Sequence, residues 1–215
     1  MPVRLPLVLT DDDLPETELR AAALDGQVYA VGDSWRSIAE IDDHVGRAIA
    51  VGFTLGAGVV AAERTAARVW GARGPAPLPH SGLVASPARV KHRGRGSVIR
   101  QVVIDDDEIV TVHGVAVTTP ARTVVDLARR EDWTPQDETA ARDVSTQQGV
   151  TSADAVAVLD RRGRLPRRAQ TVERLVRVCG ADTAIGTDDE LPGDDAHRPR
   201  RASVMEGSAQ PALTR

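Results

Sequence analysis

The chain has 215 residues, enough for one medium-sized domain with a small appendage, and 41% of them are hydrophobic, which suffices for a core. Aromatic residues make up only 2%, so that core has to be built from Ala, Val and Leu. The formal net charge of −4 argues against a uniformly basic nucleic-acid-binding surface. Cys179 is the only cysteine, which excludes an intramolecular disulfide and favours a reducing, cytoplasmic location. The apolar start, residues 2–9, is too short and too rich in proline for a signal peptide or a membrane span.

Residues 1–40 have the element order of a small winged-helix module, which is helix, helix, hairpin. Thr10 precedes three aspartates and is placed to cap a short first helix. The segment Glu16–Leu24 has the stronger helical pattern, with its apolar residues on one side. Two short alternating strands then flank a turn at Gly32 and Asp33, which would form the tip of the wing.

In that arrangement Glu16–Leu24 is the recognition helix. Thr17 is placed to reach a base edge, and Arg20 and Arg36 are placed to reach phosphates. Between residues 11 and 43, however, acids far outnumber these two arginines, and duplex affinity comes largely from cations. We therefore expect this module alone to bind DNA weakly, and a purely structural cap is the alternative interpretation.

The middle of the chain predicts two more helices and an extended connection. Asp42–Val51 has a helical pattern, and Val60–Gly71 has a second one with Trp70 on its apolar face. Because large aromatic residues are mostly buried, we expect Trp70 to anchor the core rather than to stack on a ligand. The proline-rich stretch Gly74–His80 is typical of a rigid tether.

A dense basic run follows the strand predicted at Leu83–Ala85. Residues 89–95 hold four arginine and lysine side chains and one histidine with no acid between them. They concentrate a positive field, which favours a phosphate-binding loop over a merely solvated one. The acids that follow the next alternating segment, Asp105–Glu108, lack the spacing and the glycine of a calcium loop and predict a solvated turn. The candidate nucleic-acid contacts of this region are Arg89, Lys91, Arg93, Arg95 and Arg100.

The stretch Val112–Arg129 gives the clearest structural signal. Valines on both sides of His113 and Gly114 predict two short strands joined by a tight turn. Thr119 is placed to cap a helix whose first residue, Pro120, has no amide donor to leave unpaired. We expect this helix to bury Val124, Leu127 and Ala128, with Asp126 partly off that stripe and Arg122, Arg129 and Arg130 mostly outside it.

The rest of the chain predicts three helices and a tail. A polar helix over Gln136–Gln148 is capped by Thr134, and amphipathic helices follow over Ala153–Arg162 and Val172–Val178. A second basic cluster, Arg161–Arg168, is able to face an acidic partner. The predicted fold is α+β, with a winged-helix-like module (1–40), a mixed strand and helix domain (41–178) and a disordered C-terminal tail (179–215).

Two segments carry a resemblance to a known family. The order of the elements, the helix Arg64–Gly71 and the Val115–Ala128 element together resemble the actinobacterial branch of the AbiEi-type antitoxins of type IV toxin–antitoxin systems, over residues 7–178. The resemblance implies an N-terminal winged helix that binds operator DNA. It also implies a C-terminal domain that helps to repress transcription and counteracts a nucleotidyltransferase-like toxin. If the chain is an antitoxin, we expect the C-terminal helices, Gln136–Val178, to present the toxin-contacting or regulatory surface, which includes the second basic cluster.

Enzymes are the rival class. A restriction-type nuclease needs acids beside a lysine, and the only lysine, Lys91, has no acid two residues before it. The five histidines stand in no catalytic motif, and the sequence has no glycine-rich phosphate loop. We therefore expect no catalytic residues, no metal, no cofactor and no membrane partner. The hypotheses are a DNA-binding antitoxin or regulator, a protein-interaction module without DNA affinity, and an enzyme whose dispersed site the sequence does not reveal.

Overall fold

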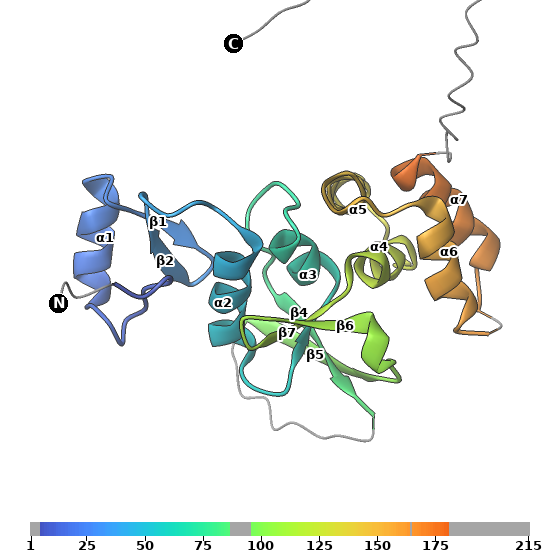
Figure 1. Ribbon diagram of the computed structural model, residues 1–215, viewed down its shortest axis with the longest axis horizontal. Coiled ribbons are helices and arrows are strands. Elements are labelled where there is room, and N and C mark those ends of the chain that lie inside the picture. Colours follow the sequence, from blue (N-terminus) through green and yellow to red (C-terminus); the bar gives the residue numbers. More distant parts are fainter. Residues whose placement is uncertain (1–4, 87–95, 164, 181–215) are drawn as a thin grey trace, which may run out of the picture. The chain divides into compact units, whose positions relative to one another are not determined.

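The computed structural model describes residues 5–86, 96–163 and 165–180, which belong to one compact unit of α+β architecture (Figure 1). The helices are α1 (Glu16–Leu24), α2 (His44–Leu55), α3 (Glu63–Val69), α4 (Pro120–Ala128), α5 (Pro135–Gln148), α6 (Ser152–Asp160) and α7 (Arg168–Cys179). The strands are β1 (Val28–Val31), β2 (Ser34–Ser37), β3 (Val60–Ala61), β4 (His80–Ala85), β5 (Ser97–Val102), β6 (Ile109–Val112) and β7 (Val115–Thr118), with a 3-10 turn at Asp106–Glu108. None of these helices is long and apolar enough to cross a lipid bilayer.

Five strands form a mixed sheet in the order β5-β4-β3-β7-β6. The central strand β3 runs antiparallel to β4 and parallel to β7, so that Ala61 lies opposite both Gly82 and Val117. β4 and β5 are parallel, and β6 and β7 form an antiparallel hairpin. The prediction of a helix from Val60 is wrong for its first residues, because Val60 and Ala61 pair within the sheet and α3 begins only at Glu63.

The hairpin and the helix start predicted around Thr119 are confirmed. His113 and Gly114 form the turn between β6 and β7, with φ angles of 48° and 83°. The Thr119 hydroxyl accepts a hydrogen bond from the Arg122 amide at 3.3 Å, and Pro120 is the first residue of α4. Local capping chemistry therefore fixes where this helix begins.

Helix α4 is the centre of the helical part of the fold. Its residues Val124 and Leu127 are fully buried, and α3, α5, α6 and α7 all contact it (Figure 1). Trp70 is confirmed as a core residue, since it is buried and its indole nitrogen donates to the Thr118 carbonyl at 2.8 Å. This hydrogen bond joins the last residue of β7 to the residue that follows α3.

The N-terminal module, residues 5–43, contains α1 and the β1–β2 hairpin, and Leu9 forms a bridge with Trp35. The prediction of a short helix after Thr10 is wrong. Residues 11–14 form a turn, in which the Asp13 carboxylate accepts hydrogen bonds from the Thr10 amide at 2.9 Å and hydroxyl at 3.1 Å. The residue before a proline is disfavoured in a helix, so Pro15 stops this turn from continuing.

Helix α2 joins the module to the sheet. In Figure 1 it lies between the β1–β2 hairpin and β7, and it contacts β2 as well as β6 and β7. Its first turn is capped by the Asp43 carboxylate, which accepts from the Gly46 amide at 2.9 Å. A small apolar cluster of Val8, Val31 and Ala50 fixes the hairpin to this helix.

The C-terminal helices agree in number and order with those predicted from the sequence. Thr134 caps α5 as predicted, and the Asp137 side chain completes a capping box. Cys179 belongs to α7 rather than to the predicted tail. Residues 181–215, which make up the rest of that predicted tail, lie outside the described residues, and the domain boundary predicted at residue 40 stays a prediction.

Candidate functional site

The predicted recognition helix α1 presents most of its side chains to solvent. Leu19 is its only buried residue, and Thr17 and Arg20 are both exposed. The Arg20 guanidinium donates to Glu16 one turn earlier at 2.7 Å, an exposed pair of little energetic weight. The geometry thus leaves α1 free for contact with a partner.

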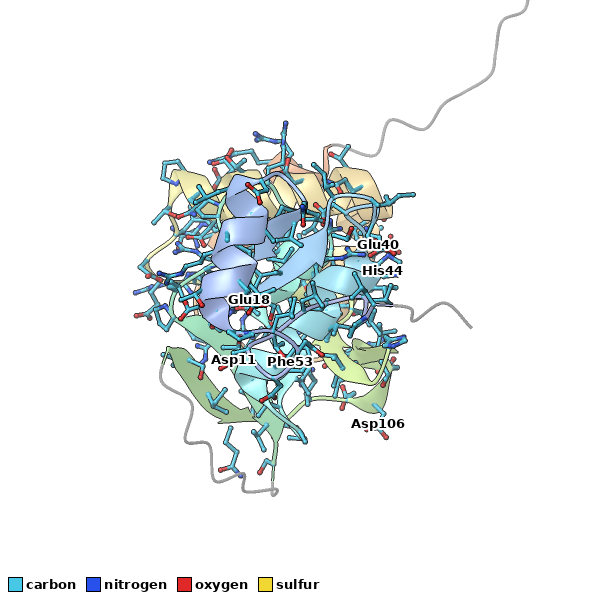
Figure 2. The ribbon with its side chains drawn as sticks, turned by 90° about the vertical axis from the view of Figure 1, so that its left-hand side faces the viewer. Asp11, Glu18, Glu40, His44, Phe53 and Asp106 are labelled. Atoms are coloured by element: carbon cyan, nitrogen blue, oxygen red, sulfur yellow. The ribbon has the colours of Figure 1, made fainter. Side chains whose placement is uncertain are left out.

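The charge of the N-terminal module is unfavourable for a duplex. Between residues 11 and 43 the chain has ten carboxylates and two arginines. Figure 2 faces this side of the molecule and shows Asp11 and Glu18 there, together with Phe53 of α2. All three side chains are exposed. Phosphates approaching this face would be repelled.

Arg36, predicted to contact phosphate, is instead a buried structural residue. Its side chain is 2% exposed, donates to the Leu7 carbonyl at 3.3 Å and pairs with Asp43 at 3.1 Å. It fills the space beside Gly46, where any β-carbon would collide with it. The prediction is wrong because the two-residue period of β2 places Arg36 on the same inward face as Ser34.

Arg100 lies on the edge strand β5, and its side chain is 57% exposed. It pairs with Glu63 at the start of α3. Figure 1 shows α1 and β5 on different sides of α2, so Arg20 and Arg100 belong to separate parts of the surface. The other cations predicted to act with them, Arg89, Lys91, Arg93 and Arg95, lie outside the described residues.

A polar cleft of about 490 Å³ lies beside Arg100, between α3, β4, β5 and α4. Arginines and carboxylates from distant parts of the sequence face each other in it. They include Glu63, Arg100, Arg122, Asp126, Arg129 and Arg130. A concave site with several convergent charged groups is suited to a polar ligand.

Glu63 joins two of the arginines in this cleft. Its carboxylate is buried and pairs with Arg130 at 2.6 Å and with Arg100. Its φ angle of 49° is unusual for a residue with a side chain, and such strain is most frequent at functional sites. Arg130 also pairs with Asp132 at 2.6 Å, so the network continues to the rim of the cleft.

Asp126 is a carboxylate of the cleft with a buried oxygen that accepts no hydrogen bond from the described residues. Burial raises its pKa, although the Arg122 guanidinium, which donates to Oδ1 at 2.8 Å, acts in the opposite direction. Its Oδ2 atom is buried without a hydrogen-bond partner among the described residues. A buried carboxyl group with a raised pKa among several arginines makes the cleft a candidate site for a polar ligand.

Two predictions about these residues are wrong. Arg122, expected mostly outside the buried stripe, is buried and pairs with Glu108 at 2.6 Å. Glu108, expected in a solvated turn, is buried as well. The spacing of Arg122 and Asp126 by four residues was a usable signal, since such pairs meet on one helix face. No local pattern connects Glu63 with Arg130, which is 67 residues away.

The described arginines of the second basic cluster pair with carboxylates of the same chain. Arg161 pairs with Asp107 at 2.5 Å, and Arg162 pairs with Glu108. Arg167 and Arg168 pair with Glu131 at 3.3 Å and Asp160 at 2.5 Å. An acidic partner predicted for this cluster would have to compete with these carboxylates.

The geometry defines an α+β protein with an acidic, solvent-facing N-terminal module and a polar cleft in the body that follows it. No protein-family model matches the chain, and a search of curated proteins finds no significant match. Within residues 5–86, 96–163 and 165–180, no three His, Cys, Asp or Glu side chains are grouped as metal ligands.

Proposed function

We propose that the protein is a non-catalytic regulator of the antitoxin type, which acts by binding a protein partner through its acidic N-terminal module. The observation that supports this most directly is the position of α1. This helix buries only Leu19, while Leu24 at its end is 91% exposed. A helix that adds so little to the core contributes an exposed surface for binding rather than packing that stabilises the fold.

The charge of the module favours one kind of partner. Residues 11–43 carry ten carboxylates, and the exposed cation of this segment, Arg20, is already paired. Opposite charges steer association, so the partner presents a cationic surface. The toxin implied by the resemblance is nucleotidyltransferase-like and handles polyanionic substrates, which bind to cationic surfaces. An acidic module on such a surface would block access of the substrate.

The test is co-expression with the product of the adjacent gene. Reversing two exposed charges of α1 together, Glu16→Lys and Glu18→Lys, should abolish co-purification and rescue of growth. Glu173→Lys is the matched control, because Glu173 is an exposed acid of α7 outside the module. The proposal fails if the double variant still co-purifies and rescues as well as the control does.

Operator DNA is the second candidate partner, and the exposure of Arg100 at the sheet edge supports it. Neutralising Arg93 and Arg95 should then weaken binding about equally on all sequences and reduce the salt dependence by about one unit of slope per lost phosphate contact. Changing Thr17 or Arg20 should alter sequence preference if α1 reads bases.

Gel retardation of the upstream region of the gene at several salt concentrations measures both effects. Retardation that weakens with salt and depends on Arg93 and Arg95 supports this second candidate. No retardation at low salt excludes DNA binding and leaves the protein partner alone.

A further inference from the structure

A small, partly open cavity of about 220 Å³ lies where the β1–β2 turn, α2 and the proline-rich segment before β4 meet. Most of its wall is apolar, with Val31, Val51 and Pro77 among the lining residues. Three polar side chains also line it, namely Arg47, Arg68 and His80. An apolar cavity with a few convergent polar groups has the composition of a small-molecule site.

Arg68 is the half-buried cation of this cavity, and it forms no ion pair with a described residue. Within the described part of the chain, its guanidinium donates only a long hydrogen bond of 3.5 Å, to the Ala72 carbonyl. Asp42 attracts it from farther away but is itself paired with Arg47 at 2.9 Å. Burial lowers the pKa of Arg68, yet a guanidinium stays protonated at neutral pH. The positive charge is therefore desolvated without a close counter-charge.

His80 adds unused hydrogen-bonding groups to the same cavity. It is 1% exposed, and neither ring nitrogen has a hydrogen-bond partner among the described residues. Burial lowers its pKa, against the attraction of Asp33, so the imidazole is neutral at pH 7 and offers one donor and one acceptor. The Tyr29 hydroxyl in the neighbouring strand β1 is likewise buried without a hydrogen-bond partner among the described residues.

We propose that this cavity binds a small organic carboxylate. The planar guanidinium of Arg68 matches a carboxylate in a two-pronged hydrogen bond, and the His80 ring can donate a further one. The apolar wall at Val31, Val51 and Pro77 accommodates a short hydrocarbon or aromatic body. Because the wall includes the β1–β2 turn, the ligand also fastens the N-terminal module to α2.

The experiment is a titration of the full-length chain with sodium benzoate, sodium butyrate and sodium phosphate at constant ionic strength. Thermal unfolding and calorimetry should show that a carboxylate binds, with Tm raised by roughly 5–10 °C at concentrations about 100-fold above Kd. Arg68→Gln should weaken this binding roughly 10- to 100-fold. Arg142→Gln, which removes an exposed arginine of α5, is the matched control and should bind as the unmodified chain does.

Two further measurements separate a ligand site from a structural role. Without carboxylate, Arg68→Gln should melt at the same temperature as the unmodified chain or higher, because it removes an uncompensated charge. In the unmodified chain, benzoate should shift the ring nitrogen resonances of His80. The proposal is overturned if neither carboxylate binds, if phosphate alone binds, if Arg68→Gln binds carboxylate as well as the control, or if that variant melts lower without ligand.

Discussion

Helices α1 and α4 have the same length of nine residues but opposite roles in the molecule. Helix α4 buries six of its residues and contacts four other helices, whereas α1 buries only Leu19 and rests on β1. The difference lies in the side chains, since the fifth, sixth and eighth residues are valine, valine and leucine in α4 but arginine, alanine and alanine in α1. Helix α4 holds the fold together, and α1 leaves its surface available for binding.

The largest expected effect comes from shortening a leucine in each helix. Leu127→Ala in α4 should lower the free energy of unfolding by about 2–5 kcal/mol, because Leu127 is fully buried and the change leaves a cavity. Leu24→Ala in α1 should change it by less than about 0.5 kcal/mol, since that side chain is exposed. Urea denaturation measures both. Similar losses for the two variants would remove the distinction between the helices.

A pH-dependent loss should follow when the cap of α5 is removed. Burial disfavours the charged form of Asp137, but hydrogen bonds from Arg64 at 2.6 Å and from Thr134 outweigh it and lower the pKa of this carboxyl. Its contribution to stability is therefore present above about pH 4, the value for an unfolded aspartate, and is lost as the pH falls through the lower folded pKa. Asp137→Asn should cost about 2–4 kcal/mol at pH 7 and progressively less on acidification.

Asp126 is the comparison for that measurement, because its pKa is shifted the other way. Burial raises the pKa, so its contribution is fully present below about pH 4 and is lost as the pH rises through the folded pKa. Asp126→Asn should thus cost less at pH 7 than Asp137→Asn does. Urea denaturation between pH 3 and pH 7 tests both signs, and parallel pH profiles for the two variants would contradict the assignment.

A smaller and more local effect is expected where the N-terminal module meets α2. Arg36→Ala removes the hydrogen bond to the Leu7 carbonyl and the pair with Asp43, at a cost of about 1–2 kcal/mol. Gly46→Ala should have a similar effect, because its new methyl group would displace the Arg36 guanidinium. Amide exchange in β1 and β2 should accelerate in both variants, whereas Arg20→Ala should leave it unchanged. Unaltered exchange in the first two would show that Arg36 does not hold the module.

The sequence was sufficient to predict those structural features that depend on residues close together in the chain. The cap at Thr119, the turn at His113 and Gly114 and the burial of Trp70 each follow from a short segment, and all are confirmed. The turn before Pro15 shows the limit of such local reasoning. Thr10 and three acids satisfy the pattern of a helix start, yet the proline prevents the helix from continuing.

The cleft and the small cavity could not be found in this way. Glu63 and Arg130 meet only because α3 and α4 pack against each other, and Arg68 and His80 line one cavity whose wall comes from four separate segments. The burial of Arg36 also depends on packing between distant segments. The alternating pattern of β2 shows that its side chains point to two opposite faces, but it does not show which face α2 covers. A sequence shows which residues are charged, but only the fold shows which residue of opposite charge each of them pairs with.

Hydrogen exchange of the full-length chain, measured with and without the product of the adjacent gene, tests the central claim most directly. The account predicts slower exchange in α1 and in the β1–β2 hairpin when the partner is present, and unchanged exchange in α4, which is already protected by burial. Slower exchange in β5 or in α5–α7, with α1 unaffected, would contradict the assignment of the acidic N-terminal module as the binding surface.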